Sequence, residues 1–196
     1  MNCFTTETIR TDLLRNYFRL IESIDARCRE IQRGYSDHLA CRRGCADCCR
    51  SFSIFPVEAA AILHGIETLP AERYERILDR SRSHGQTDQC SLLENGECLI
   101  YPFRPIICRT HGFPILTRAN GDPEVDFCPK NFTRIASLPG NAMIDIDRLN
   151  ETLVAVNRLF ISEWNAGGTA LDRIALHDIF GFWSSSTDQI KEPIDP

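Results

Sequence analysis

The stretch CRRGCADCC, residues 41–49, decides how the rest of this chain is interpreted. It places Cys41, Cys45, Cys48 and Cys49 within nine residues. Zinc and iron–sulfur sites both require thiolate sulfurs held a few ångströms apart, and this spacing supplies them on one loop. Adjacent side chains tend to diverge, so we expect Cys48 and Cys49 to serve different metals, or one to bind metal and the other to pack. The competing interpretations are disulfides and a chance cluster of small apolar residues.

Three arginines, Arg42, Arg43 and Arg50, alternate with these cysteines. A metal ion bound by four thiolates retains surplus negative charge. Guanidinium groups nearby offset that charge. The arginines therefore support the metal interpretation of the loop.

Composition limits the classes of protein to which the chain can belong. With 196 residues, 43% of them hydrophobic, we expect one domain over residues 1–183 and a flexible polar tail over residues 184–196. The sequence shows no run of eighteen apolar residues and no secretory signal, so we expect no membrane association and a cytoplasmic location. Ten cysteines in a reducing compartment favour free or metal-bound thiols over disulfides. A net charge of −5 without a basic stripe argues against nucleic-acid binding.

Helical periodicity flanks the cysteine-rich region on both sides. Apolar residues recur at steps of three and four residues over residues 6–34 and again over residues 146–166, which predicts two long amphipathic helices. Cys28 lies on the apolar stripe of the first helix, so we interpret it, and Cys3 near the terminus, as residues outside the metal site. The predicted fold is mainly α, a single domain of long amphipathic helices that supports a cysteine-rich metal-binding loop region, residues 38–130, with one short β-hairpin.

Shorter elements complete this expectation. Two helical segments follow Pro56 and Pro70. Glycines and prolines interrupt every periodic run in residues 115–145, which we expect to be irregular. A last helix is expected after Thr169, which would cap it.

A second thiol-bearing stretch, QCSLLENGECLIYPFRPIICRTHGFP, spans residues 89–114. Asn95-Gly96 between short apolar runs predicts a β-hairpin. With a two-residue turn, strand alternation would place Cys90 and Cys98 on opposite faces. The two thiols could then bind the same metal only if the loop were longer or bulged by one residue.

Two further cysteines follow the hairpin. Cys108 comes after Pro102 and Pro105, in a segment expected to be a short helix or turn. Cys128 lies in a loop with the sequence DFCPK. A cysteine before a proline in a loop is not an obvious core position, so we count Cys128 as a metal ligand.

The combined pattern resembles a known family. The pattern consists of Cys41-x3-Cys45-x2-Cys48-Cys49, then Cys90, then Gly96-x-Cys98-x-Ile100-Tyr101-x2-Arg104-Pro105-x2-Cys108-Arg109. It resembles the YkgJ-like cysteine-cluster family, also called CxxCxxCC, a zinc- or iron-chelating domain, over roughly residues 38–130. Three residues separate the first two cysteines here, where the family name implies two.

The resemblance implies a set of site residues. It implies metal ligation by seven cysteines, and Cys128 brings the number to eight, enough for two four-thiolate sites. The expected ligands are Cys41, Cys45, Cys48, Cys49, Cys90, Cys98, Cys108 and Cys128. Arg104 and Arg109 bracket the last cysteine of the motif, and we assign them to cofactor binding, as donors to sulfur or as compensating charges.

The expected function is metal binding, with iron–sulfur slightly favoured over zinc as the cofactor. A metal ion is the expected partner, and a protein partner or substrate is left open. One branch of the family resembles the lysine N-methylase that modifies flagellin, so a metal-dependent methyltransferase-like enzyme is the alternative. The spacing of Cys41, Cys45 and Cys48 also matches radical S-adenosylmethionine enzymes, but the alternating strands and helices of an α/β barrel are missing. No nucleotide loop or nucleophile motif appears, so the sequence predicts no enzymatic mechanism, substrate or protein partner.

Overall fold

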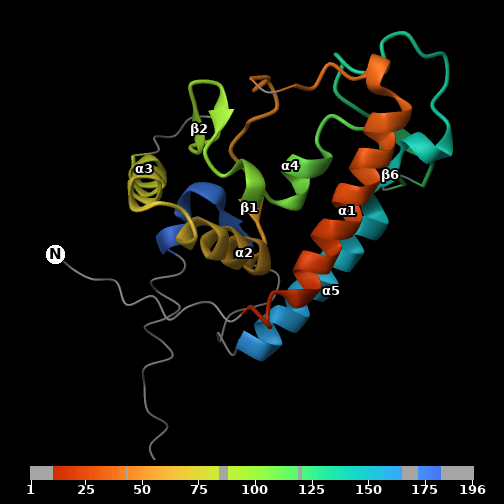
Figure 1. Cartoon of the computed structure of the whole chain (residues 1–196). Coiled ribbons are helices and arrows are strands. Elements are labelled where there is room, and N and C mark those ends of the chain that lie inside the picture. Colours follow the sequence, from red (N-terminus) through yellow and green to blue (C-terminus); the bar gives the residue numbers. More distant parts are fainter. Residues whose placement is uncertain (1–10, 43, 84–87, 119–120, 165–171, 182–196) are drawn as a thin grey trace, which may run out of the picture.

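The computed structural model describes residues 11–42, 44–83, 88–118, 121–164 and 172–181. The fold is mainly α-helical, as predicted, with a few very short strands (Figure 1). The α-helices are α1 (Arg15–Gly34), α2 (Pro56–Glu67), α3 (Ala71–Arg82), α4 (Ile106–Thr110) and α5 (Ile146–Trp164). The 3-10 helices are η1 (Ser36–His38), η2 (Tyr101–Phe103), η3 (Gly140–Ala142) and η4 (Leu176–Asp178). The expected flexible tail, residues 184–196, and Cys3 lie outside the described residues.

The two long helices predicted from periodicity are present and pack together. Helices α1 and α5 lie side by side and run in opposite directions (Figure 1). Each turns its apolar stripe inward, because residues three and four apart share one face of a helix. The first helix begins at Arg15, later than predicted, and residues 11–14 form a turn. Cys28 is buried on its inner face, with 7% of its surface exposed, so its assignment to the core is confirmed.

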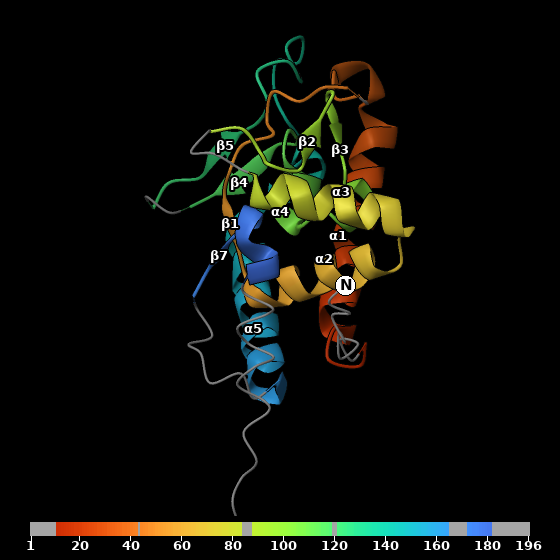
Figure 2. The same cartoon turned by 90° about the vertical axis from the view of Figure 1, so that its left-hand side faces the viewer.

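Helix α2 crosses this pair and is buried almost all round (Figure 2). Pro56 occupies its first turn, where a missing N–H costs nothing. Its run of three alanines, residues 59–61, allows the neighbouring helices to approach closely. Asn157 of α5, fully buried, accepts a hydrogen bond from the backbone N–H of Val57 at 3.1 Å. This bond ties the start of α2 to α5.

A buried carboxylate joins α2 to the short helix that carries Cys108. Glu58 is only 3% exposed. Its Oε2 accepts the backbone N–H of Phe55 at 3.0 Å, and its Oε1 accepts that of Ile106 at 3.1 Å. Burial raises the pKa of Glu58, and the two backbone donors oppose that rise. One side chain therefore satisfies unpaired N–H groups at the beginning of both α2 and α4.

The predicted hairpin is present, with the predicted two-residue turn. Strand β2 (Leu93–Glu94) pairs with β3 (Glu97–Cys98). Asn95 and Gly96 have φ values of 50° and 77°, as a type I′ turn requires. The inference that Cys90 must face away from Cys98 is wrong. The strand is too short to carry the alternation that far, because residues 90–93 form a turn in which Leu93 N donates to Cys90 O at 3.2 Å.

Two further small sheets lie where none was predicted. In one, β1 (Ser53–Ile54) pairs with β7 (Ile174–Ala175). In the other, β4 (Ile115–Thr117) lies between β5 (Glu124–Asp126) and β6 (Ile144–Asp145). The expectation of an irregular segment over residues 115–145 is therefore wrong in part, as is that of a helix across Ile174. Strands of two or three residues carry no readable period, and β1 and β6 pair with strands far along the chain.

We predict that Glu58→Gln lowers the free energy of unfolding by about 1–3 kcal/mol. The substitution keeps the size of the side chain but turns an amide N–H₂ toward one of the two backbone donors. That donor is then left buried without an acceptor. Urea unfolding followed by circular dichroism, at fixed metal content, measures the change. Glu151→Gln on the exposed face of α5 is the matched control and should stay within about 0.5 kcal/mol of wild type. Equal stability of the two variants would contradict the bridging role of Glu58.

Candidate metal centre

The loop that holds the first four cysteines is folded by two successive turns. Cys45 N donates to Arg42 O, and Cys49 N donates to Ala46 O, each at 3.0 Å. Gly44 lies within the first of these turns and has φ +86°, a backbone conformation that residues with side chains rarely adopt. Arg43 lies outside the described residues. The turns are why a short loop can present several thiols to the same side of the molecule.

One set of thiols gathers at the exposed end of this loop. Burial raises the pKa of the Cys48 thiol. The charges of three neighbouring thiols raise this pKa further, and these thiols are Cys41, Cys45 and Cys128. Such an effect requires the groups to be close in space. The last of these thiols comes from a loop about eighty residues further along the chain. We call Cys41, Cys45, Cys48 and Cys128 the outer thiol group.

An exposed ion pair spans the outer thiol group. Lys130 Nζ, two residues after Cys128, pairs with Asp47 Oδ2 of the first loop. Asp47 raises the pKa of Lys130, and the nearby thiols of Cys45 and Cys128 raise it further. This cation therefore lies beside the outer thiol group, although its full exposure keeps the energy of the pair small.

A second set of thiols lies deeper. Burial raises the pKa of Cys49 to about 11, with contributions from Cys48, Cys90 and Cys98. Burial also raises the pKa of Cys108 far above its ordinary value, and the thiols of Cys98, Cys90 and Cys49 raise it further. Cys49, Cys90 and Cys98 thus surround Cys108, and Cys48 reaches this set only through its neighbour Cys49. We call Cys49, Cys90, Cys98 and Cys108 the inner thiol group.

Four separate segments build the inner thiol group. Cys90 N donates to Cys49 O at 3.0 Å, next to an antiparallel bridge between Arg50 and Gln89. Cys98 ends the hairpin, and Cys108 lies in α4, whose first turn is held by Glu58. The adjacent residues Cys48 and Cys49 consequently belong to different thiol groups. Cys28, in contrast, lies apart in the core, where its sulfur is 3.6 Å from the carbonyl oxygen of Arg109.

The thiols are grouped but not drawn together to bonding distance. Within the described ranges, no three cysteine, histidine, aspartate or glutamate side chains lie close enough to hold a metal ion as they stand. The nature of the donors is nevertheless specific. Soft thiolate sulfurs suit zinc and iron–sulfur centres, whereas calcium and magnesium require oxygen.

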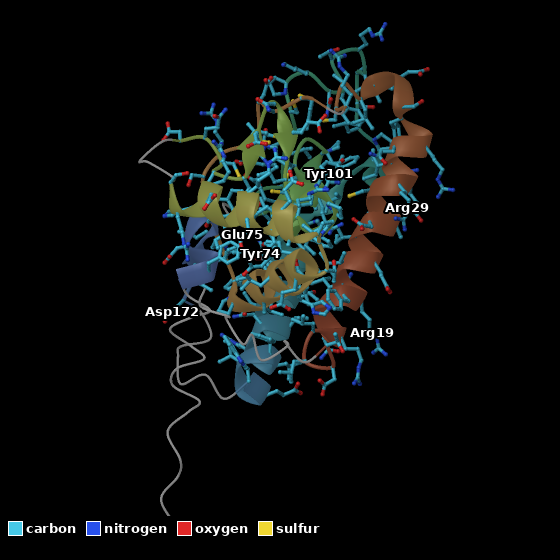
Figure 3. All side chains as sticks on the ribbon, turned by 60° about the vertical axis from the view of Figure 1, so that its left-hand side comes forward. Arg19, Arg29, Tyr74, Glu75, Tyr101 and Asp172 are labelled. Carbon is cyan, nitrogen blue, oxygen red and sulfur yellow. The ribbon has the colours of Figure 1, made fainter. Side chains whose placement is uncertain are left out.

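A cavity of about 560 Å³ borders both thiol groups. Six of the eight cysteines line it, all except Cys41 and Cys128. Most of the remaining wall is apolar, including Phe52, Leu92 and Ile100. Tyr101 also lines the cavity, is 56% exposed, and lies between α1 and α3 in the view of Figure 3.

The two arginines of the motif make different contacts. Arg104 places its guanidinium 4.0 Å from the centre of the Tyr101 ring. Burial and nearby thiols raise the pKa values of Cys98 and Cys108. The positive charge of Arg104 acts in the opposite direction and lowers both pKa values. Arg109 donates to Asp25 of α1 at 2.8 and 3.0 Å, to Arg104 O at 2.8 Å and to Pro102 O at 2.9 Å. These bonds fasten the Arg104 loop to α1.

Sequence reasoning missed two residues that position the thiols, Glu58 and Asn131. Asn131 is fully buried and donates to Cys41 Sγ at 3.2 Å. Its proximity to Cys128 in the sequence is the one signal that pointed to it. Glu58 stands inside an apolar helical run, where a buried carboxylate is unexpected.

Comparison with known proteins matches the cysteine-bearing part of the chain to a family model. No curated protein and no solved structure gives a significant match to the chain. A family model named CxxCxxCC, described as "Putative zinc- or iron-chelating domain", matches residues 40–129. The matched range contains all eight cysteines of the two thiol groups. Among the described helices, none has the length and apolar character needed to cross a bilayer. Residues 40–129 of this chain therefore match the model of the CxxCxxCC family.

Proposed function

We propose that this protein binds metal in two separate four-cysteine centres, one formed by the outer and one by the inner thiol group. The observation that carries the proposal is the grouping of eight thiols: three surround Cys48 and three surround Cys108, and Cys48 contacts Cys49 where the two sets adjoin. Four thiolates complete the tetrahedral shell of a structural zinc ion and equally supply the ligands of an iron–sulfur cluster.

We further propose that the inner centre holds an iron–sulfur cluster rather than a zinc ion. One zinc ion needs only the space enclosed by sulfurs about 2.3 Å away. The cavity of about 560 Å³ beside the inner thiols leaves room for a multi-atom cofactor. The family resemblance points the same way, whereas the C-x3-C-x2-C spacing belongs to Cys41, Cys45 and Cys48 of the outer group. A bound cluster would supply electron-transfer or Lewis-acid chemistry.

The surroundings suit a centre that carries surplus negative charge. Arg42, Arg50, Arg73 and Arg104 line the cavity, against a single acidic residue, Glu97. Guanidinium groups offset the charge left by four thiolates. Free thiols of this kind persist in a reducing compartment, which favours the cytosol. No observation on the described residues favours the methyltransferase alternative, and a structural or carrier role for the metal remains the simplest function.

We predict that anaerobically purified protein contains two metal centres, detected by metal analysis, acid-labile sulfide and a visible spectrum. Cys45→Ser should remove the outer centre and Cys108→Ser the inner one, each variant retaining the metal of the other centre. Cys28→Ser is the matched control, because its thiol is buried in the core and no thiol of either group acts on its pKa. It should retain full metal content. Colourless protein with zinc and no sulfide would exclude the cluster, and metal-free protein would exclude the proposal.

We predict that metal affinity rises with pH. Burial and neighbouring thiols raise the pKa of Cys49 to about 11, so in the metal-free protein this thiol is protonated at neutral pH. A metal binds the thiolate and releases the proton, so affinity increases as pH rises toward the pKa of the thiol. Each proton released contributes about tenfold per pH unit. Competition with a zinc chelator, corrected for its own protonation, between about pH 6 and about pH 8 measures the slope. An affinity that is constant across this range would contradict the ligand assignment.

A further inference from the structure

The side chain of Asn131 connects three segments around the outer thiol group. It is completely buried. Its Oδ1 accepts the backbone N–H of Ala40 at 2.7 Å, and its Nδ2 donates to Gly112 O at 2.7 Å and to Cys41 Sγ at 3.2 Å. Its backbone N–H donates to Cys128 O at 2.8 Å. Asn131 therefore contacts two of the four outer cysteines, one through its side chain and one through its backbone.

The orientation of this amide is fixed by its backbone partners. The N–H of Ala40 can only donate, so it must face the amide oxygen, and the carbonyl of Gly112 can only accept, so it must face the amide nitrogen. The N–H₂ group is consequently the one that faces Cys41 Sγ. A hydrogen bond from an amide N–H to a thiolate is charge-assisted and stronger than one to a neutral thiol.

The surrounding chain holds Asn131 and the Cys41 sulfur in place. Phe132 has φ 54°, which is rare for a bulky residue, and its buried ring stacks on His38 at 6.1 Å between ring centres. On the other side of the sulfur, a Cβ at Gly112 would lie 2.9 Å from Cys41 Sγ. Gly112 has φ +92°, so both its conformation and the space require glycine.

We infer that Asn131 is a positioning residue of the outer metal centre: its amide orients the Cys41 sulfur and stabilises it as a thiolate ligand. The inference rests on the proposed two-centre function. It goes further by naming a residue outside the cysteine motif that sets the affinity of one centre and not of the other. Loss of such an outer partner typically lowers metal affinity about 10–100-fold.

The test uses cobalt(II) as the metal and Asn131→Leu as the variant. Wild-type protein prepared without iron or zinc offers cobalt both four-thiolate sets, and the inner set is an internal reference within each molecule. We expect Asn131→Leu to weaken cobalt binding at the outer centre about 10–100-fold and to leave the inner centre unchanged. We also expect the sulfur-to-cobalt charge-transfer band of the outer centre to move to longer wavelength, because a sulfur without its N–H donor is more electron-rich. An outer affinity within about threefold of wild type, with an unmoved band, would overturn the inference.

Asn157→Leu is the matched control. Asn157 is also fully buried and also accepts a backbone N–H, that of Val57, but it lies at the contact of α2 with α5. Both variants leave a buried N–H without its acceptor, so their folding costs should be similar. Only Asn131→Leu should change cobalt binding at the outer centre. If Asn157→Leu weakened that centre equally, the effect of Asn131 would be one of general stability and the inference would be wrong.

A double-mutant cycle isolates the bond to sulfur. In a Cys41→Ser background, adding Asn131→Leu should cause little further loss of affinity, because the sulfur that receives the amide hydrogen bond is already gone. Additive effects would contradict the inference. Wild-type protein that bound no cobalt would overturn the proposed function and the inference together. Wild-type binding at two centres with an unaffected Asn131→Leu would overturn the inference alone.

A measurement on wild-type protein covers the case in which Asn131→Leu does not fold. In ¹⁵N–¹H spectra, filling the centres with zinc should shift the side-chain amide signals of Asn131 strongly, since one of its protons faces a ligand sulfur. The corresponding signals of Asn157 should move little. An unshifted Asn131 amide in zinc-loaded protein would overturn the inference.

Discussion

The hydrogen bond that the first N–H of α4 donates to the Glu58 carboxylate is the contact on which the placement of the thiols depends most. Glu58 is fixed in the central helix α2 and reaches the backbone of Ile106, two residues before Cys108. A carboxylate so deeply buried persists only when both oxygens are satisfied, and here both accept backbone N–H groups. The helical core and the cysteine-rich region are thereby joined through a single polar side chain. Arg109 adds a second link, because it ties the Arg104 loop to Asp25 of α1.

The segments that carry the thiols have little secondary structure of their own. Its strands are two or three residues long, and turns connect most of its thiols. Such loops bury too little apolar surface to order themselves independently. Their backbone groups therefore depend on a few buried polar residues and, in our proposal, on bound metal, whose binding energy is also folding energy.

The two thiol groups differ in their surroundings. The outer group includes the exposed Cys41 and Cys48 and lies beside the solvent-exposed pair of Asp47 and Lys130. The inner group borders a mostly apolar cavity near Arg104. A metal ion in the outer group would be more accessible to exchange, and a centre in the inner group more protected from water. Cys48 belongs to the outer group and Cys49 to the inner group, so the two environments meet at adjacent residues of the chain.

The sequence alone determined the elements that depend on local periodicity and local turn chemistry. The apolar stripes predicted α1 and α5 and the core position of Cys28, and Asn95-Gly96 predicted the hairpin and its two-residue turn, because these signals lie within a few residues of one another. The cysteine spacing predicted the family for the same reason. Only the tertiary structure decided which thiols are neighbours. Cys128 lies near the first loop although about eighty residues separate them in the sequence. Cys90 lies near Cys98 because the chain turns at residues 90–93, and strand alternation does not describe such a turn. The roles of Glu58 and Asn131 were likewise beyond the sequence, because the value of a buried polar side chain is set by partners that only the folded chain brings within hydrogen-bond distance.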